Sequence, residues 1–115
     1  MRTSRARERQ VREEEEKRAA AAVRQQRRAL VQLIETIATT LGENEGWSKE
    51  QIKRSVEFLG VDEARELFEA TQQIEADGGM LTADGKRRRT PGGVYHYLLK
   101  KRLAETGRKL ELKKS

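Results

Sequence analysis

ALVQLIETIATTLG, residues 29–42, has the clearest helical periodicity of the chain. Aliphatic residues recur in it at intervals of three and four, which places them along one face of an α-helix. That face consists of Leu30, Leu33, Ile34, Ile37, Ala38 and Leu41. Gly42 follows, as glycine commonly does at the end of a helix. The stretch predicts an amphipathic helix that packs its apolar face against other elements.

Two more helices are predicted directly downstream. Ser48 opens a capping box and predicts a helix start, with Trp47 stapled onto the following turn, and Gly60 predicts the helix end. Asp62 is placed to cap the next helix, which the Asp-Gly-Gly run at residues 77–79 terminates. The apolar positions of these helices are Ile52, Val56, Leu59, Ala64, Leu67, Phe68 and Ile74.

The last predicted helix follows a short loop. Residues 80–82 resemble an extended piece, and residues 84–85, Asp-Gly, form a favoured turn pair. Thr90 then serves as N-cap, with Pro91 at the first helical position. The apolar face of this helix consists of Val94, Tyr95, Leu98, Leu99 and Leu103. We therefore predict an all-α fold, a small helical bundle of about four to five helices with a Gly-rich basic loop before the last main helix.

Three parts are expected along the chain. Residues 1–28 are rich in Arg, Glu, Ala and Gln, which favour helix, but hold too few apolar residues to attach to a core. They are expected to form a charged N-terminal arm, helical or frayed. Residues 29–107 are expected to form the helical domain, and residues 108–115 a basic C-terminal tail.

Charge is distributed unevenly along the 115 residues. The net charge is +6, with ten Lys/Arg against five Glu in residues 1–28 and eleven against two in residues 86–115. The middle is acidic, with four Lys/Arg against twelve Asp/Glu. Basic ends around an acidic middle indicate a polyanionic partner, with nucleic acid as the first candidate.

Composition argues against several other classes of protein. Without cysteine and with a single histidine, the chain offers no thiol chemistry, no nucleophile–base pair and no metal cluster, so we expect no catalytic residues, no cofactor and no small-molecule substrate. No run approaches the length of a membrane span, and the N-terminus lacks the apolar centre of a signal peptide. The expectation is an intracellular protein, cytoplasmic if microbial and nuclear or cytoplasmic if eukaryotic.

GKRRRTPGG, residues 85–93, joins the densest positive charge to a helix start. Unpaired N–H groups at a helix start commonly bind phosphate. The candidate contacts are Lys86, Arg87, Arg88, Arg89 and the hydroxyl of Thr90. Gly92 and Gly93 each weaken a helix by about 1 kcal/mol against Ala, and they would let a ligand approach the backbone closely. The alternative is a solvated turn whose glycines only permit a bend.

Further candidates lie along the last helix. His96 and Tyr97 fall off its apolar face, so both are expected to face solvent, His96 as an ordinary surface residue. An exposed aromatic ring can stack on an unpaired base, which favours single strands. Packing of Tyr97 on a neighbouring helix is the alternative. Lys100 and Lys101 extend the positive surface, together with Arg102.

The segment DGGMLTADGKRRRTPGGVYHYLLKK, residues 77–101, resembles the RNA-binding domain of the phosphorylated adaptor for RNA export (PHAX) family. The shared elements are a Gly-Gly pair, a short apolar piece, a turn, then Arg-Arg-Arg-Thr-Pro-Gly-Gly-Val-aromatic and Leu-Leu-Lys. The resemblance implies an all-helical domain that binds single-stranded RNA with little sequence preference. It places RNA-binding roles on Arg87, Arg88, Arg89, Thr90, Gly92 and Gly93, whereas Lys86 is added from its charge. Export activity is not implied.

Three other classes are considered. A DNA-binding, nucleoid-associated helical protein would use residues 48–76 as a helix pair, but the exposed face of that pair is acidic (Glu50, Glu57, Glu63, Glu66 and Glu69). A protein-assembly module would use the first helix, which lacks sustained heptads before residue 29. An enzyme lacks the necessary residues. The favoured hypothesis is a non-catalytic protein that binds single-stranded RNA.

Overall fold

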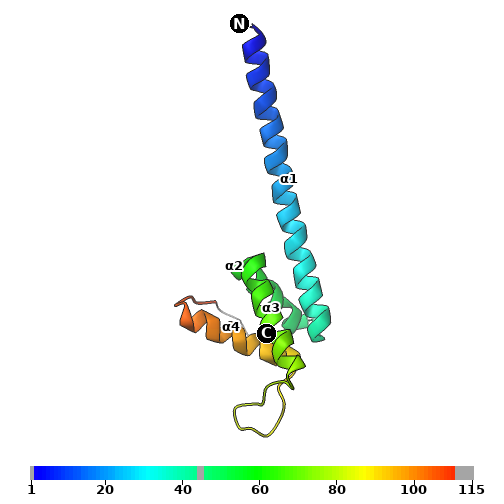
Figure 1. Cartoon of the computed structure of the whole chain (residues 1–115), viewed down its shortest axis with the longest axis vertical. Helices are drawn as coiled ribbons and strands as arrows, with labels where there is room; N and C mark the ends of the chain where they lie inside the picture. The colour runs from blue at the N-terminus through cyan, green and yellow to red at the C-terminus, as the bar shows by residue number, and fades with distance from the viewer. Residues whose placement is uncertain (1, 44–45, 111–115) are drawn as a thin grey trace.

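The described part of the chain folds into four α-helices (Figure 1). The computed structural model describes the backbone of residues 2–43 and 46–110, and the side chains of residues 4–43 and 48–110. The helices are α1 (Arg2–Leu41), α2 (Gly46–Leu59), α3 (Val61–Ala76) and α4 (Pro91–Glu105). The prediction of a small all-α bundle with a loop before the last main helix is confirmed.

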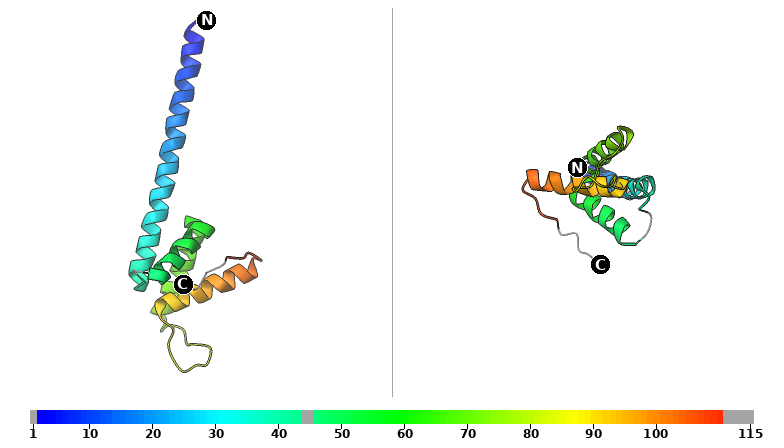
Figure 2. Two further views of the ribbon diagram at one scale, coloured as in Figure 1. Left: turned by 180° about the vertical axis from the view of Figure 1, so that it is seen from behind. Right: turned by 90° about the horizontal axis from the view of Figure 1, so that it is seen from below.

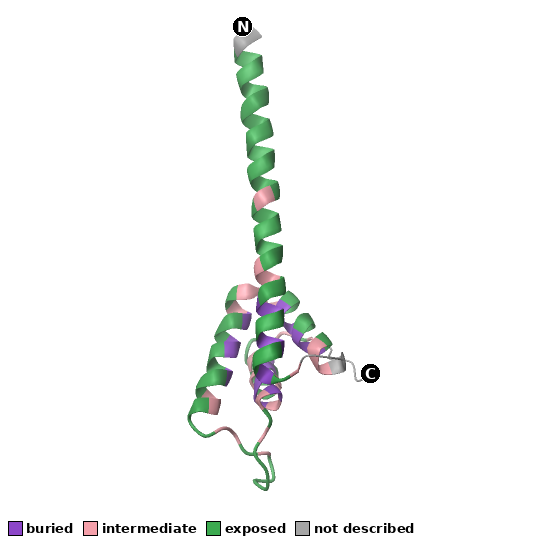
Figure 3. Ribbon diagram, turned by 90° about the vertical axis from the view of Figure 1, so that its right-hand side faces the viewer, coloured by how far each residue is buried: buried purple, intermediate pink, exposed green. Residues whose placement is uncertain are grey.

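The arm and the first packed helix are one continuous helix, α1, of 40 residues. No glycine or proline occurs between its ends, so nothing in the sequence breaks it at residue 28. Side chains of residues 4–28 are exposed, apart from a half-buried Ala21 (Figure 3). The arm therefore stands clear of the other helices (Figure 2), and the molecule measures 78 × 30 × 28 Å.

The core lies where the C-terminal part of α1 meets the other three helices. The apolar face predicted for residues 29–42 is buried there from Leu33 to Leu41. Ile52 and Val56 of α2, Leu67 of α3, and Leu99 of α4 lie in the same cluster. Full burial of each such side chain stabilises the fold by about 1.5–3 kcal/mol, so this cluster holds the bundle together.

Two helix starts differ from the prediction. α2 begins at Gly46, so Ser48 lies inside the first turn and is not the N-cap. The predicted staple of Trp47 lies outside the described side chains. The N-cap of α3 is Gly60, with a φ of 88°, and Asp62 instead lies in the first turn with Glu63. Carboxylates in a first turn are favoured by the helix dipole, which explains why the acidic residue still suits this position.

A buried hydrogen bond joins α2 to α4. The Ser55 hydroxyl donates to the carbonyl of Ile52 at 2.7 Å, which leaves its oxygen free to accept from the Tyr95 hydroxyl, also at 2.7 Å. Tyr95 is fully buried, and burial raises its pKa to about 12. The phenol thus satisfies its polar end inside the core while its ring packs.

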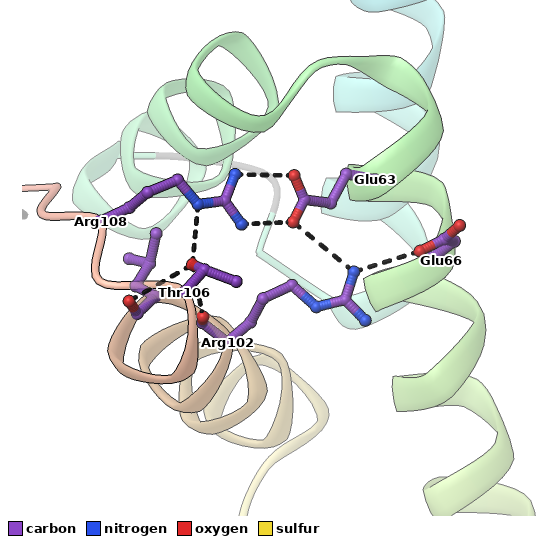
Figure 4. Close-up of polar contacts among 6 residues, drawn as sticks. Glu63, Glu66, Arg102, Thr106 and Arg108 are labelled. Carbon is purple, nitrogen blue, oxygen red and sulfur yellow. Dashed lines mark hydrogen bonds and ion pairs between the residues drawn. The ribbon is translucent and has the colours of Figure 1, made fainter.

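The segment after α4 folds back onto α3 (Figure 4). The Arg108 guanidinium donates to both carboxylate oxygens of Glu63, at 2.8 and 2.5 Å, and to the hydroxyl of Thr106 at 2.8 Å. These hydrogen bonds from Arg108 hold the pKa of Glu63 below its ordinary value. Leu110 packs half-buried against the core. The predicted basic tail therefore begins as a docked strap, and its residues 111–115 lie outside the described part.

Candidate nucleic-acid interface

The basic loop, residues 78–90, is an ordered hairpin at the end of the molecule opposite the arm (Figure 1). Leu81 and Arg88 form an antiparallel bridge, and the Arg89 N–H donates to the Met80 carbonyl at 2.6 Å. At the turn, Asp84 accepts from the Thr82 hydroxyl at 2.6 Å and from the Lys86 N–H at 3.0 Å. These bonds, that from Thr82 first, lower the pKa of Asp84. The predicted turn is thus present and its cations are held on a defined backbone.

Two of the four cations in the loop are engaged within the protein. Arg88 pairs with Glu75 of α3 at 2.5 Å. Arg89 donates to the Leu81 carbonyl at 3.0 Å, and its guanidinium lies 5.0 Å from the centroid of the Tyr97 ring. A cation at this distance from an aromatic ring is attracted to it. Arg88 and Arg89 therefore fix the loop against α3 and α4, a role that the sequence did not indicate.

The other two cations project into solvent. Lys86 and Arg87 are exposed, and their side chains have no hydrogen bond or ion pair with any described residue. Lys100 and Lys101 of α4 are also exposed. In contrast, Arg102 pairs with Glu63 and Glu66 (Figure 4), so the prediction that it extends the positive surface is wrong. Each of the four exposed cations is available to a phosphate.

The start of α4 is capped as predicted. The hydroxyl of Thr90 accepts from the Gly93 N–H at 3.0 Å, and Pro91 is the first helical residue. Gly92 is buried, and a methyl group there would collide with the Glu43 carboxylate beyond α1. Its lack of a side chain therefore leaves room for the Glu43 side chain beside the start of α4. A methyl group at Gly93 would lie 3.2 Å from the Thr90 hydroxyl.

The two ring-bearing side chains of α4 that lie off its apolar face, His96 and Tyr97, have different environments. Tyr97 is 41% exposed, in agreement with one of the two alternatives for it. His96 is half-buried and its Nδ1 is buried without a partner among the described residues, so the expectation of an ordinary surface residue is wrong. Burial lowers the pKa of His96, with Lys100 acting in the same direction and Glu43 opposing. Tyr97 alone of the pair offers a ring to a base.

Leu81 is a candidate that the sequence analysis missed. Its side chain is 60% exposed, and its carbonyl holds Arg89, which in turn lies over Tyr97. Leu81 therefore adds exposed apolar surface to the hairpin that carries the cations. The residue was read only as part of an extended piece, because nothing in its own spacing shows which side chains surround it.

Membrane spans and metal clusters are both absent from the described part of the chain. Within residues 2–43 and 46–110, every helix is too polar or too short to cross a membrane. Among the same residues, no group of three or more His, Asp or Glu side chains is arranged to hold a metal ion.

Comparison with known proteins identifies the family. Residues 33–114 match the family described as the RNA-binding domain of the phosphorylated adapter RNA export protein. Proteins of that name from Gallus gallus and Mus musculus are 48% identical over 52 residues, and the one from Homo sapiens is 46% identical. The match covers 45% of this chain but only 13–14% of those three proteins.

A solved structure agrees with this assignment. The structure, described as a novel RNA-binding domain in Cryptosporidium parvum, is 36% identical and superposes with a TM-score of 0.54. The aligned region covers 64% of this chain and 79% of the chain in that structure. The family match extends over most of the helical bundle and all of the basic loop. The chain belongs to the family of the RNA-binding domain of phosphorylated adapter RNA export proteins.

Proposed function

We propose that this protein binds single-stranded RNA, without catalysis, at the basic loop and the N-terminal half of α4. Membership of an RNA-binding family supports binding to RNA in general. The observation that carries the finer proposal is the position of Arg89, which lies against the Tyr97 ring and belongs to the same loop as the exposed Lys86 and Arg87. An exposed ring and unpaired cations are therefore carried by one loop and the helix that follows it.

The four cations of the loop have different roles in this proposal. Lys86 and Arg87 contact phosphates directly, because nothing in the described protein occupies them. Arg88 acts by holding the loop to Glu75, and Arg89 by orienting the ring surface. Lys100 and Lys101 are exposed farther along α4, where they contact further phosphates of the same strand.

The surface suits a single strand better than a duplex. Stacking on Tyr97 needs an unpaired base, and the described hairpin is short, with one isolated bridge. The exposed faces of α2 and α3 carry Glu50, Glu57, Glu66 and Glu69, which repel a DNA backbone. The structure thus offers no observation that favours the DNA-binding alternative.

A charge-matched pair of variants tests the proposal. Lys86→Ala with Arg87→Ala removes two exposed cations from the loop, while Arg54→Ala with Arg65→Ala removes two from α2 and α3. Binding of a fluorescent oligouridylate should weaken by about tenfold in the loop variant and by less than about twofold in the control, since only the first loses phosphate contacts. Melting temperatures of both should stay near that of the wild type. Equal losses, or tighter binding of the wild type to duplex DNA than to RNA, would contradict the proposal.

A further inference from the structure

The arm carries its charge unevenly around the axis of α1. Successive residues of an α-helix are rotated by about 100°, so each side chain can be assigned to one half of the circumference. Over residues 4–28, one half holds seven Lys/Arg and two Glu, whereas the opposite half holds two Arg and three Glu. We call the first half the basic face. An arm that only needed solubility would have no reason to separate its charges in this way.

Two rows of cations run along the basic face. Arg5, Arg9 and Arg12 follow one another at spacings of four and three. Lys17, Arg24 and Arg28 form a neighbouring row at spacings of seven and four, with Arg27 between the rows. Both sets of spacings keep side chains on one side of a helix. The two acidic residues of this face, Glu13 and Glu16, lie between the N-terminal and C-terminal cations.

The cations of the basic face have no hydrogen bond or ion pair with any described residue. All of them are exposed, and the ion pair found in the described arm joins Arg18 to Glu14 at 3.7 Å, on the opposite half. The family match begins at residue 33, so the arm lies outside the region that identifies the family. Its function is therefore not assigned by that membership.

The arm lacks the apolar stripe that other partners would need. Its exposed large hydrophobic residues, Val11 and Val23, lie on opposite halves of the helix. A helix lying on a membrane needs a continuous apolar face, and a coiled coil needs apolar residues at heptad spacing. Charge alone is left to recognise a partner, and its sign selects a polyanion.

Toward the bundle, the side of α1 that carries the basic face borders a groove between α1 and α2. Val31 and Glu35 lie on the same side of α1 and, with Lys49, Glu50 and Lys53 of α2, line the groove between the two helices. Lys49 is neutralised by Glu35 at 2.8 Å, but Lys53 is exposed. The groove is therefore neutral overall, and Lys53 is its one lysine without an ion pair among the described residues.

The arm and the basic loop lie at opposite ends of the molecule (Figures 1 and 2). Arg12 is roughly 40 Å from the C-terminal end of α1, at about 1.5 Å per residue. A stacked RNA of about six nucleotides spans roughly 20 Å, so it cannot reach both surfaces, whereas about thirty nucleotides span roughly 100 Å. A single strand must be long to touch the loop and the arm together.

We propose that the basic face of the arm is a second RNA-contact surface, which binds the part of a long single strand that extends beyond the basic loop. The inference rests on the proposed function, because the same strand is held at the loop. It adds a dependence on RNA length that the loop alone does not have. The rigid helix holds its cations at a fixed distance from the first site, so that binding at one raises the local concentration of RNA at the other.

Two double variants of the full chain test this surface. Arg9→Gln with Arg12→Gln removes two charges from the basic face, and Arg7→Gln with Arg18→Gln removes two from the opposite half. Glutamine is a good helix former, so both keep α1 intact. The probes are oligouridylates of about six and about thirty nucleotides, titrated at several salt concentrations.

The basic-face variant should bind the long RNA about fivefold more weakly than the wild type, with a salt slope shallower by about 1.4, or about 0.7 per lost phosphate contact. Its affinity for the short RNA should be unchanged. The opposite-half variant should lose less than about twofold on either RNA, since its cations lie away from the strand.

The outcomes separate this inference from the proposed function. Failure of the wild type to bind either RNA refutes the proposed function itself. Binding of the short RNA with equal losses in the two variants on the long RNA, or with no loss in either, overturns the inference alone. Loss of a dimer in light scattering, or of binding to anionic vesicles, without a change in RNA affinity would assign the basic face to a different partner and overturn it as well.

Discussion

At the scale of single residues, partners distant in the sequence decide what each charged or polar side chain does. Arg87 and Arg88 are neighbours in the same run, yet one is free and the other is bound to Glu75. Lys101 is exposed, while the next residue, Arg102, is paired with α3. A basic run is therefore not a uniform binding surface, and replacing its members together would mix loop structure with RNA contact.

Tyr95→Phe should lower the free energy of unfolding at neutral pH by about 1 kcal/mol, because it removes the hydrogen bond to Ser55. Burial raises the folded pKa of Tyr95 above its ordinary value of 10.0 to about 12. The stability that depends on the neutral phenol is therefore complete below pH 10 and is lost as the pH rises through about 12. Urea unfolding of both proteins across this range should show the advantage of the wild type disappearing. A constant advantage at every pH would contradict this account.

At the scale of elements, the start of α4 depends on a cap that the sequence identified correctly. Thr90→Ala should lower the free energy of unfolding by about 1 kcal/mol, because the N–H of Gly93 loses its acceptor. Thr90→Ser keeps a hydroxyl at the same position and should cost only a few tenths of that amount. Urea unfolding at neutral pH measures both. Equal losses in the two variants would show that the methyl group of Thr90, not the hydroxyl, is what matters.

Local patterns predicted the existence and order of the helices, and they failed where a boundary carries no local signal. The three-and-four spacing of Leu33, Ile37 and Leu41 and the glycine after α2 are both properties of adjacent residues, so both could be read directly. Apolar content placed the junction between arm and bundle near residue 29, but it could not show that α1 continues through this junction without a break. Only burial changes there, and burial depends on the other helices.

The candidate interface was predicted in part for the same reason. Thr90 and Pro91 affect only the backbone of the adjacent helical turn, so their roles can be predicted from the sequence. The pairing of Arg88 with Glu75 spans 13 residues and that of Arg108 with Glu63 spans 45, and neither can be found from spacing. The side chain beside Gly92 belongs to Glu43, which is far from it in the sequence, so this neighbour could not be found from spacing either.

At the scale of the whole molecule, stability and length are separate properties. Deleting residues 1–28 should leave the urea midpoint and the m-value nearly unchanged, because side chains of residues 4–28 bury almost nothing. The truncated protein should have a much smaller hydrodynamic radius, as measured by analytical size exclusion. A clearly lower midpoint would show that the arm contributes to folding of the bundle.

Because α1 is unbroken, it also fixes the direction in which each side of the arm faces relative to the bundle. Two alanines inserted after Arg28 would rotate every residue before them by about 200°, which turns Arg9 and Arg12 away from the side of α2. Seven alanines would rotate the same residues by only about 20° and would move them about 10 Å farther from the bundle. Long RNA should then bind the two-residue insertion as weakly as it binds the Arg9→Gln, Arg12→Gln protein, and the longer insertion almost as well as the wild type. If the arm were joined to the bundle by a flexible linker, neither insertion would change the affinity for long RNA. An affinity that depends on the rotation produced by the insertion therefore requires a continuous helix.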